Sequence, residues 1–447
     1  MNAKKILALL FAVLMVAGCL TACGSTKPAT TDPAGTQAAT QGGETAIVPW
    51  SAEDIAYLGE AIKAEANGNK VTLKLWQPEA AQDVFKAQVA DFKEIFKDYA
   101  DIEIEVAIMA EGDAGAQVLS DPNAAADVFG FASDQIMRVA KPGAIAAVKY
   151  PNEVKAMNSP ESVEAASYDG KLVAYPEVGD NSYFLCYNKD LVTDEQAKSL
   201  EAIFEACKAA DKRFIMDAGN SYFACMFPFT GGLKTDGLEE DGETQKFNDY
   251  NIDEVTAAVK AFADLFKSYQ GTFEKNTTTA VIDGFKNNTT AAGVIGSWDI
   301  ASAKAALGDK AGFAILPTIN VNGTDKPIIN MFGYKFIGVN SQSKYPEAAQ
   351  ALAYYLSNEE CQRERAEQLE WGPSNVNVAN SDLVQGNASM AAILAQAANS
   401  VPQTIITGTF WTPMEALGTY VAEPSNDFSE AAVKAEVEKC ITNIRDL

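Results

Sequence analysis

The sequence places six aromatic residues in loops or at the ends of predicted strands, where a ring can face a ligand. These residues are Phe131, Tyr183, Tyr222, Trp298, Trp371 and Trp411. A flat apolar ring suits the C–H face of a sugar, whose rim carries hydroxyl groups. Each ring taken alone is also compatible with core packing, so the interpretation depends on their recurrence in loops.

Carboxylate and amide side chains recur close in sequence to these rings. The set comprises Glu79, Asp134, Asp180, Asn181, Asn220, Asp299 and Glu415. Such groups accept and donate the hydrogen bonds that sugar hydroxyls require, although any one of them could be a solvated surface group. The rings and the polar groups together predict a carbohydrate site.

The composition argues against several other kinds of site. The chain contains 0 His, which removes the Ser-His-Asp triad, the Cys-His dyad and His-ligated metals. A pair of carboxylates could still hydrolyse a glycosidic bond. The formal net charge of −25 disfavours nucleic-acid and anionic-membrane binding, which need clusters of Lys and Arg. We therefore expect no catalytic residue, no metal, no cofactor and no nucleic-acid partner.

The N-terminus has the pattern of a processing signal. Lys4 and Lys5 precede an apolar run at residues 6–16, and two small-residue sites end in Cys19 and Cys23. This pattern predicts a lipoprotein signal peptide at residues 1–22, with Cys23 favoured for lipidation and Cys19 as the alternative. A signal peptide without lipidation is the third possibility. Residues 23–45 have almost no large apolar side chain, so we expect a flexible tether there.

Five cysteines follow the N-terminal signal: Cys186, Cys207, Cys225, Cys361 and Cys440. Their number is odd, their spacing is wide and none forms a C-x-x-C pair. We expect them to be small buried hydrophobic residues.

The first half of the chain alternates strands with helices. Strands are expected at residues 71–76, 102–109 and 126–131, with an amphipathic helix at residues 83–99. This order predicts a largely parallel sheet with crossover helices. Ligands of such sheets lie beyond the carboxyl ends of strands, which points to residues 77–79 and 131–135.

A chain of 447 residues is too long for one ordinary core, so two lobes are expected. The stretch 171–190 has two extended runs, at residues 172–175 and 183–187. The Pro- and Gly-containing break at residues 176–181 is not expected to be buried sheet. We expect the chain to pass between the lobes at this break. Residues 233–250 are expected to form an acidic turn.

Several segments resemble one known family in their order and spacing. They are DVFGFASD at 127–134, YDGKLVAYP at 168–176, YNKDL at 187–191, GVIGSW at 293–298, ILPT at 315–318, and VPQ at 401–403 followed by FW at 410–411. The chain resembles the extracellular solute-binding lipoproteins of ABC sugar importers, of the maltose/maltodextrin-binding type. The resemblance runs from about residue 71 to the C-terminus.

This resemblance implies an α/β, two-lobe periplasmic-binding-protein fold of type II, with a hinge and an interlobe cleft. The chain would cross between the lobes near residues 176–180, 318–323 and 371–373. The N-terminal lobe would comprise residues 46–178 and 320–371, and the C-terminal lobe residues 179–319 and 372–447. The implied function is to bind an oligosaccharide, α-1,4-linked maltooligosaccharide or maltodextrin, and to deliver it to the transmembrane permease subunits of an ABC transporter. The protein would act as a monomer, held by its lipid anchor at the extracellular face of the bacterial cell membrane.

The resemblance also implies roles for individual residues. Phe131, Tyr222, Trp298 and Trp411 match stacking rings, Asp134 a hydroxyl acceptor, Glu79 a polar contact, and Asp180 or Asn181 a carboxylate near the hinge. Three positions depart from the family pattern. Gln135 replaces a positive residue, Asn220 replaces a Glu, and Glu415 replaces an Arg, so the sugar's length and linkage are less securely implied than the aromatic platform.

Alternative functions remain open from the sequence. A protein of the same fold could bind another sugar, a peptide or a polyamine, and a cationic ligand would suit the acidic composition. A carboxylate-based glycosidase and a surface adhesin without transport partners are the other two alternatives.

Overall fold

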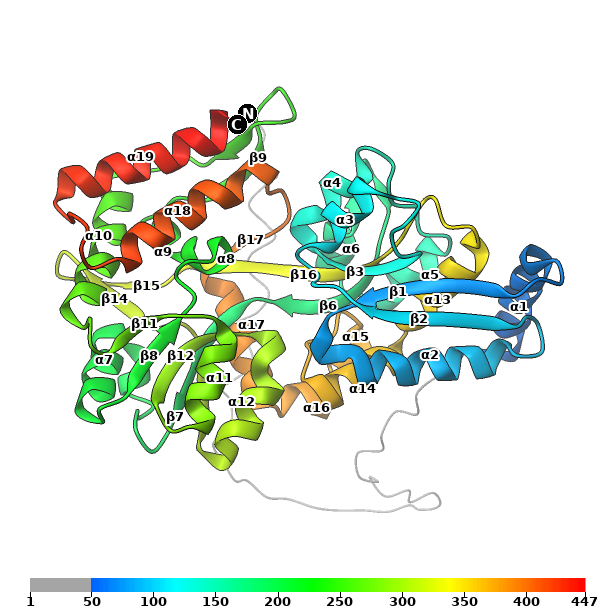
Figure 1. Ribbon diagram of the computed structural model, residues 1–447, viewed down its shortest axis with the longest axis horizontal. Coiled ribbons are helices and arrows are strands. Elements are labelled where there is room, and N and C mark those ends of the chain that lie inside the picture. The colour runs from blue at the N-terminus through cyan, green and yellow to red at the C-terminus, as the bar shows by residue number, and fades with distance from the viewer. Residues whose placement is uncertain (1–49, 447) are drawn as a thin grey trace, which may run out of the picture. The chain divides into compact units, whose positions relative to one another are not determined.

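The structure, a computed structural model, describes residues 50–446 of the chain. The expected signal peptide, both candidate lipidation cysteines and the expected tether lie outside these residues. The described part contains two mixed sheets flanked by helices (Figure 1). The fold class is therefore α/β, as the alternation of strands and helices predicts.

The first sheet has the strand order β17-β16-β3-β1-β2, and β6 pairs with β16. Its strands are β1 (Val71–Gln77), β2 (Ile102–Ile108), β3 (Val128–Ala132), β6 (Tyr175–Asn181), β16 (Asn330–Val339) and β17 (Ser400–Pro402). β1, β2 and β3 are parallel, as expected. β16 is antiparallel to both β3 and β6, so the sheet is mixed rather than largely parallel.

Helices surround this sheet. They are α1 (Ala52–Ala66), α2 (Gln82–Phe96), α3 (Ala114–Ser120), α4 (Ile136–Ala140), α5 (Pro151–Met157), α6 (Pro160–Ala165), α13 (Pro346–Leu356) and α14 (Glu359–Leu369), with the short α15 (Val376–Ala379) and α16 (Asp382–Gln385). α1 begins with the expected capping box of Ser51 and Asp54. α2 buries Phe85, Val89 and Phe92 on one face, as its periodicity predicts.

The second sheet has the order β11-β8-β12-β7-β13. Its strands are β7 (Tyr183–Asn188), β8 (Arg213–Met216), β11 (Phe273–Lys275), β12 (Thr290–Gly296) and β13 (Ala311–Ala314). The helices of this part are α7 (Leu200–Ala209), α8 (Ser221–Ala224), α9 (Met226–Thr230), α10 (Ile252–Ser268), α11 (Thr278–Lys286), α12 (Ile300–Leu307), α17 (Ala388–Gln396), α18 (Trp411–Ala422) and α19 (Glu430–Asp446).

Three short antiparallel pairs complete the strands. They are β4 with β5 (Ser167–Tyr168, Lys171–Leu172), β9 with β10 (Thr235–Leu238, Gln245–Phe247) and β14 with β15 (Thr318–Val321, Thr324–Pro327). The pair β9–β10 corrects the expectation of a simple acidic turn at residues 233–250. Gln245 and Phe247 are buried there, so the segment has an inward face that its acidic composition hides.

Two of the chain passages between the sheets lie side by side. β6 belongs to the first sheet and β7 to the second, and Ser182 stands between them. The Ser182 hydroxyl donates to the carbonyl of Met331 at the start of β16 (2.9 Å), and the Asn330 amide donates to the carbonyl of Tyr183 (2.7 Å). Met331 packs in the core of the second sheet and Phe336 in that of the first, so this second passage lies within β16 and not at residues 318–323.

The expectation that residues 176–181 avoid buried sheet is wrong, because β6 is almost entirely buried. Pro176 is tolerated because β16 is the neighbouring strand of β6 in this sheet and register shifts interrupt their pairing. Val178 also forms an isolated bridge with Pro373. The carboxylates of β6 are buried with partners: Glu177 lies 4.0 Å from Arg365, and Asp180 accepts from the backbone N–H of Gly372 at 2.8 Å.

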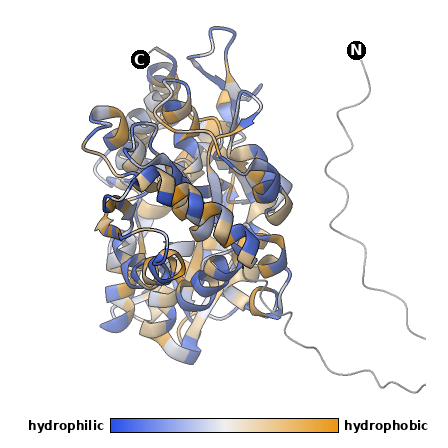
Figure 2. Cartoon of the chain, turned by 90° about the vertical axis from the view of Figure 1, so that its right-hand side faces the viewer, coloured by the Kyte–Doolittle hydropathy of each residue, from blue (hydrophilic) through white to orange (hydrophobic). Residues whose placement is uncertain are grey.

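The described cysteines are buried, as their sequence pattern predicts. All five are also free. Hydrophilic and hydrophobic stretches alternate along the helices at the end of the molecule that carries α1 (Figure 2), as in amphipathic helices. No helix within residues 50–446 is long and apolar enough to cross a membrane.

Candidate ligand-binding site

A cavity of about 620 Å³ lies between loops that follow strands of both sheets. Pro78 follows β1, Glu111 follows β2 and Asp134 follows β3. From the second sheet, Tyr222 lies beyond β8 and Trp298 beyond β12. The cavity therefore lies at the carboxyl ends of strands, where an α/β sheet is expected to bind its ligand.

The structure brings seven of the predicted site residues to this cavity: Asp134, Asn181, Asn220, Tyr222, Trp298, Trp371 and Trp411. The rings of Tyr222 and Trp298 are neighbours, with centroids 6.1 Å apart. Both are only half-buried, so part of each ring faces the cavity. Phe223 packs behind them, 5.7 Å from the Tyr222 ring and 6.4 Å from the Trp298 ring, and holds this aromatic wall in place.

A chain of hydrogen bonds crosses the cavity wall. The Gln403 amide donates to Asp134 (2.9 Å), and the Asn181 amide donates to Gln403 (2.9 Å). The hydroxyl of Tyr222 donates to the backbone carbonyl of Asn181 (3.1 Å). The chain thus links η2 (Ser133–Gln135), after β3 of the first sheet, to α8 of the second sheet. Of the two residues between which the sequence left a choice, Asn181 lines the cavity and Asp180 does not.

The other six predicted residues do not line the cavity: Glu79, Phe131, Asp180, Tyr183, Asp299 and Glu415. Glu79 and Glu415 are exposed, and Asp299 accepts from the backbone N–H of Gly296 (3.2 Å). Asp180 is buried in the connection between β6 and Gly372. These four residues therefore do not line the cavity, although the sequence predicts them as ligand-binding residues.

Phe131 and Tyr183 are core residues, which corrects their expected place beside a ligand. Phe131 has an exposed fraction of 0 % and packs 5.4 Å from Phe129 and 5.8 Å from Phe336, centroid to centroid. All residues of β3 are buried, so a ring near its end has no open face. Tyr183 is likewise fully buried and lies behind Tyr222, at 5.1 Å.

The polar or charged residues of the lining that were not predicted from the sequence include Glu111, Asp113, Arg138, Lys335 and Gln403. Two of these residues had a signal in the sequence. Glu111 follows a predicted strand, and Lys335 is a charged residue inside an apolar strand. Gln135 does not occupy the cavity: its amide donates to the Glu111 carbonyl (2.6 Å) and its oxygen accepts from Gly115 (2.8 Å). Arg138, one helical turn later, brings a positive charge to the lining.

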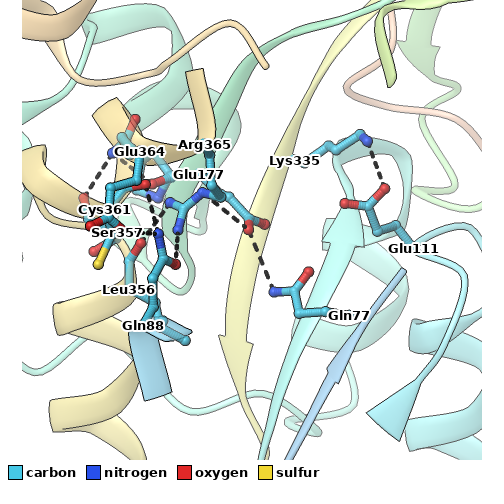
Figure 3. A network of polar contacts seen from close by, with 12 residues as sticks. Gln77, Gln88, Glu111, Glu177, Lys335, Leu356, Ser357, Cys361, Glu364 and Arg365 are labelled. Carbon is cyan, nitrogen blue, oxygen red and sulfur yellow. Dashed lines mark hydrogen bonds and ion pairs between the residues drawn. The ribbon is translucent and has the colours of Figure 1, made fainter. Parts of the chain in front are cut away.

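Lys335 and Glu111 form an ion pair of 2.6 Å at the cavity, with side-chain exposed fractions of 4 % and 10 % (Figure 3). The Lys335 ammonium also lies 5.3 Å from the centre of the Trp298 ring and 4.8 Å from that of Trp371. Both distances are within the range of cation–π attraction. The cavity therefore contains a cation that the chain itself supplies.

Burial perturbs two carboxyl groups around this site. It raises the pKa of Asp134 to about 7, against the opposing effects of Arg138 and of the hydrogen bond from Gln403. It raises the pKa of Asp180 to about 6, against the hydrogen bond from Gly372 and the charge of Lys335. Both groups therefore hold protons in the folded state that they release in the unfolded chain at the same pH.

We expect the folded state to lose stability as the pH rises from 5 to 8. Both carboxyls have folded-state pKa values above their unfolded values, so the folded protein binds more protons between about pH 4 and pH 7. The burial penalty is therefore absent at low pH and complete above pH 7. Thermal melting at pH 5, 6.5 and 8 measures the trend, and Asp134→Asn should make it less steep. An equal pH slope in the wild type and in Asp134→Asn would contradict this prediction.

Comparisons with known proteins identify a matching family and similar folds. A family described as "Bacterial extracellular solute-binding protein" matches residues 87–392. A galactooligosaccharide-binding protein of Bacillus subtilis (strain 168) is 26% identical over 406 residues, which cover 84% of this chain and 91% of the relative. A solved structure with acarbose is 26% identical, covers 85% of this chain and 99% of its own, and has a TM-score of 0.76.

More distant structures support the fold alone. The maltodextrin-binding protein MalE1 from L. casei BL23 without ligand is 24% identical, with a TM-score of 0.68 over 84% of this chain and 99% of its own. The expected fold, that of maltose-binding-like periplasmic proteins, is confirmed by these similarities.

Proposed function

Because the chain belongs to the family of bacterial extracellular solute-binding proteins, we propose that it captures an oligosaccharide in the cavity between its two sheets and delivers it to an ABC importer. The observation that carries this proposal is the combination of four aromatic residues, Tyr222, Trp298, Trp371 and Trp411, with the hydrogen-bond chain of Asp134, Gln403 and Asn181. Rings bind the apolar faces of sugars, while amides and carboxylates bind their hydroxyls.

The favoured ligand is an α-1,4-linked maltooligosaccharide. The resemblance of the sequence to maltodextrin-binding proteins implies stacking roles for Tyr222, Trp298 and Trp411, and a protein solved with acarbose shares the fold at 26% identity. A β- or α-linked galactooligosaccharide is the second candidate, because the relative from Bacillus subtilis carries that name at the same identity. The rings suit either sugar, so linkage depends on the polar contacts.

A titration of residues 46–447 distinguishes these ligands. Intrinsic tryptophan fluorescence should respond saturably to maltooligosaccharides, and its dependence on length reports the number of sugar subsites. Galactooligosaccharides, xylo-oligosaccharides, a peptide mixture and putrescine are the competing ligands. A response to galactooligosaccharides alone would change the substrate and keep the class. The absence of a response to every sugar, checked by calorimetry, would overturn the proposal.

Binding without catalysis is part of the same proposal. We expect saturating maltooligosaccharide to remain intact during prolonged incubation, with chromatography of the sugar as the measurement. Shorter products would favour the glycosidase alternative. We expect the affinity to be the same with and without a chelator, since the proposed site uses rings, amides and carboxylates to hold the sugar.

We also propose the partners, the location and the domain division that the resemblance implies. The protein would be monomeric, anchored through a lipid on Cys23 to the extracellular face of the cell membrane, and would dock on the permease subunits. Mass spectrometry of the mature N-terminus would distinguish Cys23 from Cys19. The lobes would comprise residues 46–178 with 320–371 and residues 179–319 with 372–447, and the β16 contacts support moving the boundary at 320 into that strand.

A further inference from the structure

Lys335 is an unusual side chain for its position. It lies in β16 beside the core residues Phe336 and Ile337, and only 4 % of its side chain is exposed. Its ammonium group lies 2.6 Å from a carboxylate oxygen of Glu111 (Figure 3). It also lies over the rings of Trp298 and Trp371, 5.3 Å and 4.8 Å from their centres. A buried ammonium needs such partners, since an unpaired charge away from water is strongly unfavourable.

The surroundings of Lys335 are rich in carboxyl groups. Its positive charge opposes the burial-driven rise in the pKa of Glu177, Asp180 and Asp299, so it acts on three carboxyls besides Glu111. Atom Oε1 of Glu111 is buried and has no hydrogen-bond partner within residues 50–446. The positive charge of the Lys335 ammonium therefore favours the ionised form of each of these carboxyls. Glu177 has a second cationic neighbour, Arg365, at 4.0 Å.

Two aromatic faces with a carboxylate between them form the type of site that binds an ammonium ligand. The ring faces attract a cation, and the carboxylate gives it a charge-assisted hydrogen bond. A protein that binds an amine or a polyamine in such a site needs the position beside the rings and the carboxylate to be free for the ligand. In this protein the ammonium group of Lys335, on β16, occupies that position.

We propose that Lys335 is a specificity-determining residue: its side chain occupies an ammonium site made by Glu111, Trp298 and Trp371, and thereby keeps the cavity for uncharged ligands. The exclusion has two causes. The Lys335 ammonium fills the space between the rings, and its charge repels a second cation. This inference deepens the proposed function and rests on it for the identity of the uncharged ligand. The occupied ammonium site itself does not depend on which sugar binds.

The test removes the ammonium group of Lys335 by substitution and then adds a small ammonium compound as a free ligand. In Lys335→Ala, titration with ethylammonium and with putrescine should give saturable tryptophan quenching, with an affinity at least about tenfold above that of the wild type. Ethanol and 1,4-butanediol, the uncharged analogues of these amines, should give no comparable gain. Ethylammonium should also raise the melting temperature of the variant and leave that of the wild type unchanged.

Two control variants separate charge from space. Lys335→Arg retains a cation and should not gain amine binding. The double variant Lys335→Ala/Glu111→Gln retains the space but loses the carboxylate, and should lose most of the gain. If Lys335→Ala does not fold at 25 °C, Lys335→Ser serves the same purpose, because it also removes the ammonium group and leaves its space open.

Two results would overturn the inference: equal putrescine affinity in the wild type and in folded Lys335→Ala, or an equal gain with the uncharged analogues. The amine measurements use no sugar, so they are independent of the proposed function. A wild type that binds no oligosaccharide, together with amine binding in Lys335→Ala, would reject the proposed function and support the ammonium site. Sugar binding by the wild type, without any gain in amine affinity in Lys335→Ala, would support the proposed function and reject the ammonium site.

Discussion

Replacing Trp298 by alanine is expected to weaken oligosaccharide binding about 30-fold, or about 2 kcal/mol. The ring is half-buried at the cavity and packs with Tyr222 and Phe223, so it presents a fixed apolar face. It also lies closely over Gly296 at the end of β12, where a Cβ would meet the ring at 2.2 Å. A platform held in this way loses little entropy when a sugar stacks on it.

Calorimetric titration with the preferred oligosaccharide measures this effect. Trp298→Phe should lose less affinity than Trp298→Ala, because it keeps a smaller ring in place. Trp50→Phe is the matched control: Trp50 packs against Phe96, Tyr354 and Tyr355, outside the cavity, and its replacement should leave the affinity unchanged. A loss of less than about threefold in Trp298→Ala would remove this ring from the binding site.

The second large effect is expected on stability and concerns Arg365. Its guanidinium is buried, with an exposed fraction of 1 %, and donates to the Gln88 side chain (2.8 Å) and the Leu356 carbonyl (2.6 Å). Glu177 lies 4.0 Å away and is also within 3.5 Å of the Gln77 amide (Figure 3). Removing one partner of a buried pair leaves the other charge uncompensated, so Arg365→Met should cost about 3 kcal/mol or more in unfolding free energy.

The same helix supplies the control for this prediction. Arg363 pairs with Glu359 at 3.2 Å within α14, at the more exposed side of the helix. Arg363→Met should therefore cost about 1 kcal/mol or less. The double variant Arg365→Met/Glu177→Gln should recover part of the lost stability, because it removes the uncompensated carboxylate. Urea unfolding measures all three, and similar losses in Arg363→Met and Arg365→Met would contradict the prediction.

The loss in Arg365→Met should also depend on pH. Burial raises the pKa of Glu177 to about 7, and Arg365 opposes that rise. Without Arg365 the folded-state pKa rises further, so the folded variant takes up a proton as the pH falls and the penalty decreases. The destabilisation should therefore be larger at pH 8 than at pH 5.5.

The polar residues around the cavity explain how two sheets can cooperate in binding. Asp134 and Gln403 are 269 residues apart in the chain, yet their side chains share a hydrogen bond next to Asn181. A sugar that bonds to this chain and stacks on Trp298 would contact loops from both sheets. A ligand changes the relative stability of an open and a closed arrangement only through such contacts with both parts.

The sequence by itself determined the elements with regular periodicity and the family. The capping box of Ser51 and Asp54 and the apolar face of α2 follow local rules, because each depends on residues close in the chain. The parallel direction of β1 to β3 follows from the alternation of strands and helices along the sequence. The absence of His is also read from the sequence alone, and it excludes the catalytic sites that need a histidine. The ordered motifs indicated a two-lobe binding protein before any contact was known.

Only the tertiary structure decided which side chains face the cavity. Phe131 and Trp371 are both aromatic residues that the sequence places in a loop or at the end of a strand, but Phe131 lies in a strand covered on both faces, whereas Trp371 reaches the lining. Period-2 alternation disappears in a strand buried on both faces, so its sequence does not show the direction of a ring. The burial of β6 and the pairing of Lys335 with Glu111 likewise depend on contacts between distant segments, which no local pattern specifies.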